Sequence, residues 1–120
     1  MYPIKDFMTT SILSVDIQTS VEVAAKLMSE KKISSLLVKE GEEYVGIVTK
    51  TDFVKKLIAE DRNPKTTNID CVMSKPFYSL DEYVQRGEAS EFMLRKKIKH
   101  LVVTHAKKVV GILTAKDMLS

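Results

Sequence analysis

The sequence of 120 residues contains one cysteine, four glycines, three prolines and no tryptophan. The single cysteine, Cys71, cannot close a disulfide within the chain, and no Cys-x-x-Cys pair accompanies it to suggest a zinc site. Hydrophobic residues make up 44% of the chain and charged residues 29%. This composition excludes collagen-like, low-complexity and disordered chains and is typical of one globular domain.

Long apolar runs and long blocks of one charge are also missing. No run approaches the roughly 18 residues that a membrane helix needs, and no segment resembles a signal peptide. The net charge of +3 arises from 19 basic and 16 acidic residues scattered along the chain, too small an excess to indicate nucleic-acid binding. We therefore expect a reducing, cytoplasmic location and no membrane partner.

The chain contains an internal repeat with a constant offset. The sequence ISSLLV at 33–38 returns as IKHLVV at 98–103, and VGIVT at 45–49 returns as VGILT at 110–114. Because position 33 corresponds to 98 and position 49 to 114, the offset is 65 residues without a gap. We predict two copies of one unit, residues 1–55 and 66–120, joined by a helix end and polar linker at 56–65.

Hydrophobic spacing in the first copy predicts the order helix, strand, strand, helix. Apolar residues from Val21 to Met28 recur at helical spacing, and Thr19 and Glu22 have the spacing of a capping box. Residues 35–38 and 44–48 are rich in β-formers and predict a hairpin. A second helix is expected from about Lys50, with an apolar stripe of Phe53, Val54, Leu57 and Ile58.

The first helix of the second copy is the weakest element of the pattern. Gly87 falls within it and costs about 1 kcal/mol relative to alanine in a helix interior. Ser79 and Glu82 offer a capping box, so we expect this helix to begin near Leu80 and to bend at Gly87. Since a unit of about 55 residues is marginally stable alone, the two sheets are expected to pack about a pseudo-twofold axis as one α/β domain.

The most closely repeated motif is GIVTKTD at 46–52 and GILTAKD at 111–117. Each lies at a strand-to-helix junction, where unpaired N–H groups favour an anion, and Lys50 and Lys116 add positive charge. Asp52 and Asp117 could accept hydrogen bonds from a ribose diol. The spacing Thr-x-x-Asp also fits a purely structural capping box, which is the alternative interpretation.

These residues resemble a tandem pair of cystathionine-β-synthase (CBS) domains, also called a Bateman module. The resemblance rests on the ordered repetition of the helix, the strand with Ile-x-x-Leu-x-Val, the hairpin and Gly-Ile-[Val/Leu]-Thr-x-x-Asp, and it covers nearly the whole chain. The sequence departs from the family in lacking the proline of Leu-Pro-Val, at Leu37 and Val102, and in the helix around Gly87. The resemblance implies an α+β fold of two βαββα-type repeats whose small sheets are flanked by helices.

The resemblance further implies a regulatory module that binds AMP, ADP, ATP or S-adenosylmethionine in clefts drawing on both copies. In each cleft the aspartate would hold the ribose, the threonine would lie near the ribose or phosphate, and apolar residues would enclose the adenine. One cleft would combine Ile112, Thr114, Lys116 and Asp117 with Thr10, Ile12, Leu13, Ile33 and Ser34. The other would combine Ile47, Thr49, Lys50 and Asp52 with Phe77, Tyr78, Ile98, Lys99 and His100.

The two expected clefts differ in charge. Lys99 and His100 match positions where basic residues meet phosphates in the family, and their counterparts are Ser34 and Ser35. Because phosphate prefers charge-assisted donors, the Asp52 cleft is expected to be the better site for ATP or ADP. The alternative is that Lys99 and His100 form a solvated strand end.

No enzyme is expected, because no constellation of nucleophile, base and oxyanion donor is visible. His100 and His105 lack partners that would indicate a metal site. The resemblance implies a homodimer through helical faces and an output through an unknown effector protein. The alternatives are a ligand-free interaction module and, less favoured, nucleic-acid binding. Candidate dimer residues are Phe53, Val54, Leu57, Ile58, Phe92, Met118 and Leu119.

Overall fold

The computed structural model describes residues 1–119 and has an α+β fold with two three-stranded sheets. Ser120, the last residue of the expected second copy, lies outside the described residues. The chain divides into two compact units. One is Leu13–Phe77, and the other combines Met1–Ile12 with Tyr78–Ser120. The predicted α+β fold is confirmed.

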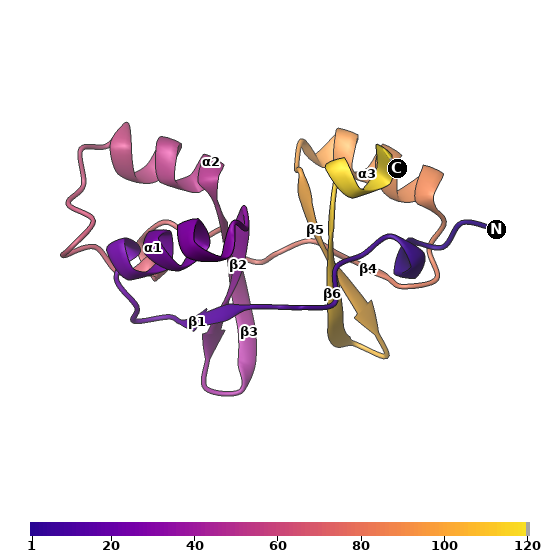
Figure 1. The fold of residues 1–120 in the computed structure, drawn as a ribbon, viewed down its shortest axis with the longest axis horizontal. Coiled ribbons are helices and arrows are strands. Elements are labelled where there is room, and N and C mark those ends of the chain that lie inside the picture. The colour runs from indigo at the N-terminus through magenta and orange to yellow at the C-terminus, as the bar shows by residue number, and fades with distance from the viewer. Residues whose placement is uncertain (120) are drawn as a thin grey trace. The chain divides into compact units, whose positions relative to one another are not determined.

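The Leu13–Phe77 unit contains one sheet with two helices on one of its faces (Figure 1). Strand β2 is central, parallel to β1 and antiparallel to β3, as the hairpin predicted. Helix α2 continues directly into a π-helical segment. The elements are β1 Ser14–Asp16, α1 Val21–Lys31, β2 Ser35–Glu40, β3 Glu43–Thr49, α2 Lys50–Phe53 and the π-helical segment Val54–Ile58.

The other unit repeats this order with one α-helix. Strand β5 is central, parallel to β4 and antiparallel to β6. The unit also contains two short 3-10 helices. One, Ile4–Asp6, lies near the start of the chain, and the other, Lys116–Leu119, follows β6. The remaining elements are β4 Ser79–Asp81, α3 Arg86–Lys96, β5 His100–His105 and β6 Lys108–Thr114.

Strands β1 and β4 were not predicted by the hydrophobic spacing, although the βαββα order implied by the resemblance includes a strand before the first helix of each repeat. Each strand has only three residues, which is too short for an alternating pattern to register. Both are held by parallel pairing to a central strand, Ser14 opposite Leu37 and Ser79 opposite Val102. Parallel partners lie far apart in sequence, so the pairing is a tertiary interaction.

The predicted cap of α1 is wrong by one residue. Ser20 is the N-cap, and its hydroxyl accepts the Val23 N–H at 3.3 Å. Thr19 instead closes a turn, because its N–H donates to the Asp16 carbonyl at 2.9 Å. The helix therefore begins after Ser20, and its apolar face from Val21 to Met28 is buried as predicted.

The predicted start of the second-copy helix near Leu80 is also wrong. Leu80 lies in β4, whose backbone hydrogen bonds go to the sheet. Helix α3 begins at Arg86, with Gln85 as N-cap. Gly87 consequently lies in the first turn and not in the helix interior, so no bend is required there.

The predicted apolar stripe of the second helix divides into buried and exposed residues. Leu57 is buried in the core and Phe53 packs against it, whereas Val54 and Ile58 are 58% and 69% exposed. The cause is the change of winding, since the Ala59 N–H donates to the Val54 carbonyl five residues back, at 2.9 Å. A stripe with α-helical spacing cannot stay on one face of a π-helical turn.

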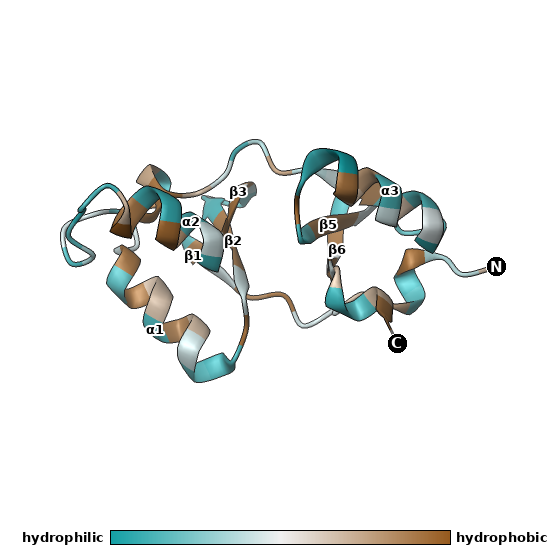
Figure 2. Cartoon of the chain, turned by 90° about the horizontal axis from the view of Figure 1, so that it is seen from above, coloured by the Kyte–Doolittle hydropathy of each residue, from teal (hydrophilic) through white to brown (hydrophobic). Residues whose placement is uncertain are grey.

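The core of the Leu13–Phe77 unit lies between α1 and one face of the sheet. Leu36, Val38 and Val48 point toward it, while Leu37 and Ile47 alternate to the other face and are buried as well. Figure 2 shows the resulting contrast along α1, where hydrophobic and hydrophilic stretches share one helix. The second unit repeats this with Leu101, Val103 and Leu113 in its core.

The opening segment of each sequence repeat packs in the unit of the other repeat. Ile69, Val72 and Met73 are buried in the Leu13–Phe77 core, and Ile4 is buried in the core that contains β4–β6. Backbone hydrogen bonds attach these segments to the sheets. Ser74 and Ile47 exchange two bonds, at 2.8 and 3.1 Å, and Thr9 and Ile112 exchange two, at 2.9 and 3.0 Å. The repeats in sequence and the packed units are thus different divisions of the chain.

Two glycines allow this attachment. A Cβ atom at Gly46 would lie 2.7 Å from the Met73 sulfur and 3.0 Å from the Ser74 carbonyl oxygen. A Cβ atom at Gly111 would lie 2.5 Å from the Met8 sulfur and 2.9 Å from the Thr9 carbonyl oxygen. The carbonyl oxygens cannot move without breaking the backbone bridges, so these positions exclude larger residues.

We expect Gly46→Ala to destabilise the protein by about 2 kcal/mol, because the methyl group overpacks the contact with Met73 and Ser74. Gly87→Ala is the matched control, since nothing lies within 4 Å of its added Cβ. It should stabilise the helix by about 0.5 kcal/mol. Urea unfolding measures both changes, and equal effects at the two glycines would contradict the packing argument.

Candidate ligand-binding junctions

The junction between β3 and α2 contains the predicted capping box. The Asp52 N–H donates to the Thr49 hydroxyl at 3.4 Å, and the Thr49 N–H donates to Asp52 Oδ2 at 2.9 Å. The Thr49 hydroxyl lies 3.3 Å from the same carboxylate oxygen, to which it donates. Thr49 ends the strand and caps the helix, so the motif positions both side chains by local backbone geometry.

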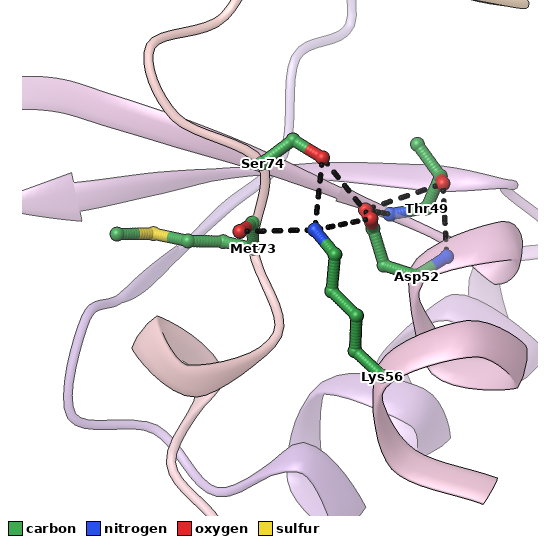
Figure 3. Close-up of polar contacts among 5 residues, drawn as sticks. All are labelled: Thr49, Asp52, Lys56, Met73 and Ser74. Atoms are coloured by element: carbon green, nitrogen blue, oxygen red, sulfur yellow. Dashed lines mark hydrogen bonds and ion pairs between the residues drawn. The ribbon is translucent and has the colours of Figure 1, made fainter. Parts of the chain in front are cut away.

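Two further residues, Lys56 and Ser74, bind the Asp52 carboxylate (Figure 3). Lys56 Nζ lies 3.1 Å from Asp52 Oδ1, and the Ser74 hydroxyl donates to that oxygen at 3.0 Å. Lys56 Nζ also donates to the Ser74 hydroxyl and to the Met73 carbonyl, both at 3.4 Å. The cluster thus connects α2, the π-helical segment and the bridging segment at Met73–Ser74.

This cluster saturates Asp52 and removes it from solvent. Only 6% of the residue is exposed, and both carboxylate oxygens accept hydrogen bonds. A buried carboxylate is tolerated when it is paired and hydrogen-bonded, as it is here. A ribose diol could reach Asp52 only by displacing Ser74 or Lys56.

The junction after β6 has the same box in a more open setting. The Thr114 N–H donates to Asp117 Oδ2 at 3.0 Å, and the Asp117 N–H donates to the Thr114 hydroxyl at 3.1 Å. Asp117 is only partly buried, and its neighbour Lys116 is exposed. Thr9, which corresponds to Ser74 by the repeat offset, is exposed as well. The two junctions therefore share a backbone geometry and differ in the surroundings of the aspartate.

The residues of the expected clefts lie in both units. In Leu13–Phe77, Leu13 lies beside β2, because its carbonyl accepts the Leu37 N–H at 3.1 Å. Ile33 and Ser34 directly precede β2 and are partly buried. Ile47 lies in β3 next to the junction and is 7% exposed, Lys50 is the exposed first residue of α2, and Phe77 is partly buried.

In the other unit, the remaining residues lie around the start of β5 and the end of β6. His100 is paired with Thr114 across the two strands, and the Lys99 carbonyl accepts the Ala115 N–H at 3.0 Å. Lys99 is exposed, while Ile98 and His100 are partly buried. Thr10 directly follows Thr9, which forms the backbone bridge to Ile112. The Tyr78 carbonyl accepts the Val102 N–H at 3.2 Å. Ile12 is partly buried.

Tyr78 belongs to a group of aromatic and basic side chains. Its ring meets Phe92 edge to face with centroids 5.8 Å apart, and it is 45% exposed. Lys96 Nζ lies 5.3 Å from the Tyr78 ring centroid and 5.8 Å from that of Phe92. His105 is the last residue of β5 and pairs with Glu82.

Sequence reasoning missed Lys56 and Ser74. Lys56 follows Asp52 by four residues on one helix, a spacing that favours an ion pair, so this partner could have been found. Ser74 lies 22 residues from Asp52 and approaches it only because the backbone bridge to Ile47 brings the segment there. No local pattern contains that information.

Within residues 1–119, no three side chains of His, Cys, Asp or Glu are grouped so that they could hold a metal ion. The same residues include no helix with the length and apolar character of a membrane span.

The sequence profile of the CBS domain matches residues 4–59 and matches again at residues 69–120. The chain belongs to the CBS domain family. The internal repeat is thereby confirmed as a pair of CBS domains. Membership in this family supports a general function, that of a regulatory ligand-binding module.

Solved structures show the same fold over nearly the whole chain. An uncharacterised conserved protein from Pyrococcus horikoshii is 31% identical with a TM-score of 0.93, covering 98% of this chain and 89% of that one. The hexameric CBS-CP12 protein from bloom-forming cyanobacteria is 29% identical with a TM-score of 0.91, covering 99% of this chain and 70% of that one. Oligomers therefore occur among CBS proteins of this fold.

Similar sequences occur in longer proteins. An uncharacterised protein of Methanopyrus kandleri is 33% identical over 103 residues, which are 85% of this chain and 53% of that protein. An inosine-5'-monophosphate dehydrogenase of Korarchaeum cryptofilum is 34% identical over 115 residues, which are 95% of this chain and 23% of the enzyme. The chain thus spans about half or less of the length of these relatives.

We expect Asp52→Ala to lower the free energy of unfolding by about 2 to 3 kcal/mol, because it removes a cap and leaves Lys56 and Ser74 without their acceptor. Asp117→Ala is the matched variant and should cost less, about 1 kcal/mol, because this carboxylate is only partly buried. Urea titrations of both proteins make the comparison. Equal losses would show that Lys56 and Ser74 add nothing to the first junction.

Proposed function

We propose that the chain is a non-catalytic regulatory module that binds an adenosine compound, AMP, ADP, ATP or S-adenosylmethionine. Membership in the CBS family supports regulation by a ligand. Each Thr-x-x-Asp junction holds a carboxylate in place by a backbone N–H, and a carboxylate can accept hydrogen bonds from a ribose diol. Binding would regulate a partner if the ligand has different affinities for two states of the module.

The Asp117 junction is the better candidate for the ribose contact. The observation that carries this choice is the difference in burial, since Asp117 is only partly buried whereas Asp52 is 6% exposed. Asp117 Oδ2 is held by the Thr114 N–H, which orients the carboxylate. The exposed ammonium group of Lys116 adds positive charge for a phosphate.

The Asp52 junction fits a structural role better. A ribose there would have to replace the Ser74 hydroxyl and the Lys56 ammonium, both of which already satisfy the buried carboxylate. In the sequence, the basic residues Lys99 and His100 favoured the Asp52 cleft as the site for ATP or ADP. The saturation of Asp52 supports assigning the first ligand to the Asp117 junction, with Ile112, Thr114, Thr10 and Ile12 of the same unit.

A homodimer through helical faces is part of this proposal. Val54, Ile58 and Leu119 are 58%, 69% and 87% exposed, so they can supply apolar contact area. Leu57 cannot contribute as expected, because it is buried in the core of its own unit. The hexameric state of the cyanobacterial CBS-CP12 protein supports association of such modules. An effector protein would receive the signal.

A ligand-free interaction module is the second candidate. Both capping boxes are completed by the chain itself, so each junction is stable without a ligand. In that case the exposed apolar helix residues would carry the function, and nucleotides would leave the stability unchanged.

A thermal unfolding panel with AMP, ADP, ATP, S-adenosylmethionine, GTP and inorganic phosphate tests the ligand class. An adenosine compound at about a hundred times its Kd should stabilise the fold by roughly 2.7 kcal/mol. GTP and phosphate should leave Tm unchanged, because they lack adenine. If no adenosine compound raises Tm, the ligand-free module is the better conclusion.

The junction assignment is tested by Asp117→Asn against Asp52→Asn in the same panel. Asp117→Asn should abolish the ligand-dependent rise in Tm, because an amide cannot replace a carboxylate that accepts from both ribose hydroxyls. Asp52→Asn should lower the baseline Tm and keep the rise. The reverse pattern would assign the ribose to the Asp52 junction.

The dimer is tested by light scattering of the variant Val54→Lys/Ile58→Lys. Two added charges on an apolar contact should shift the protein toward the monomer, since burying unpaired charges is costly. The matched control is Tyr2→Lys/Tyr83→Lys, which changes two residues of similar exposure, 60% and 56%, outside the helices. A wild-type protein that is monomeric at high concentration would contradict the dimer.

A further inference from the structure

A hollow of about 420 Å³ lies against the two helices of the Leu13–Phe77 unit. It is lined from α1, from the start of α2 and from the residues between α1 and β2. This volume is in the range of small-molecule sites. The lining residues are Ala25, Met28, Ser29, Lys32, Ile33, Lys50 and Phe53.

The lining divides into an apolar surface and a cationic rim. Met28 is 4% exposed and belongs to the core, and Ile33 and Phe53 pack against that core. These side chains offer an apolar surface with little freedom to collapse. Lys32 and Lys50 are exposed, and Ser29 supplies a hydroxyl.

The two lysines have no intramolecular counter-charge. Within residues 1–119, neither ammonium group forms an ion pair or a side-chain hydrogen bond. Lys32 is held as the C-cap of α1 in the left-handed region, with φ of 55°, and Lys50 is the first residue of α2. Both backbone positions are fixed, so the rim presents two positive charges beside an apolar surface.

The corresponding region of the second repeat differs at four of the lining positions, those of Ala25, Ser29, Lys50 and Phe53. Ser90 and Met118, which correspond to Ala25 and Phe53, contact each other, with the Ser90 hydroxyl 3.6 Å from the Met118 sulfur. Ala115 stands at the position of Lys50, so only Lys97 keeps its charge. The repeated fold forms without the second lysine, which indicates that the cationic rim is not a requirement of folding.

We propose that this hollow binds a small amphipathic anion, with a short acyl or aryl body on Met28, Ile33 and Phe53 and an anionic head at Lys32 and Lys50. The apolar body would be stabilised by burial, and the head by charge-assisted hydrogen bonds. The hollow shares Ile33 with the cleft expected around Asp117 and Lys50 with the one expected around Asp52. Lys32 and Phe53 belong to the hollow alone, so variants can separate the two sites.

Octanoate is the probe, and NMR of the ¹⁵N-labelled full chain is the measurement. Octanoate should shift amide signals saturably in residues 25–33 and 50–53. Octanamide, which lacks the charge, and acetate, which lacks the apolar body, should each bind at least about tenfold more weakly. Equal binding of octanoate and octanamide would overturn the role of the lysines.

The variant Lys32→Asn/Lys50→Gln should weaken octanoate about tenfold or more, because both charge-assisted contacts are lost. Asparagine is chosen at 32 since it tolerates the left-handed conformation. The matched control, Lys97→Asn/Lys55→Gln, removes the same charge, and Lys97 caps α3 at φ of 57°. The control should bind octanoate as the wild type does. Equal affinity of the two double variants would overturn the site.

Asp117→Asn distinguishes this site from the proposed adenosine site. It should abolish the response to adenosine compounds and leave octanoate binding unchanged. If octanoate shifts the amide signals of residues 98–117, or if the octanoate-induced shifts disappear in Asp117→Asn, the two sites are not separate and the proposal fails. Analytical ultracentrifugation at the NMR concentration completes the test. If a second copy of the chain covers residues 25–33 and octanoate produces no shift, the hollow is a contact surface and the proposal fails.

Discussion

The pair of backbone hydrogen bonds between Ser74 and Ile47, repeated between Thr9 and Ile112, is the constraint on which the structure depends. Strands β3 and β6 are at the edges of their sheets, and each bridge satisfies part of an edge that would otherwise be open. The bridges require the bare backbones of Gly46 and Gly111. They also bring the apolar residues around Ile69 and Ile4 into the two cores.

The bridge at Ser74 has a second consequence, because it brings a hydroxyl to the carboxylate of Asp52. Together with Lys56, this hydroxyl converts a simple capping box into a buried polar cluster. The Asp117 junction retains the box but has the exposed Thr9 where the first junction has Ser74. The two junctions thus share one backbone geometry, and side chains from distant segments bury the aspartate of the first more deeply than that of the second.

The helices show a similar divergence between the copies. The winding of α2 changes to π-helical at Val54, which turns Val54 and Ile58 outward while Leu57 stays in the core. At the other end of α2, Lys50 and Lys32 place two positive charges beside an apolar hollow. In the second repeat, Ala115 stands at the position of Lys50, and Ser90 and Met118, at the positions of Ala25 and Phe53, contact each other. Surfaces that folding does not require are therefore the places where the two copies differ in chemistry.

The sequence by itself determined the repeat, both hairpins, the apolar face of α1 and the reciprocal capping boxes, because each depends on residues close together in the chain. Local hydrophobic spacing could not determine β1 and β4, which are held by pairing to β2 and β5. It also missed the true start of α3, because β4 takes Ser79 and Leu80 into a sheet. The saturation of Asp52 was equally beyond local pattern, since Ser74 lies 22 residues away. Tertiary structure alone decided which aspartate is buried and fully hydrogen-bonded, because its partners come from segments that meet only when the chain is folded.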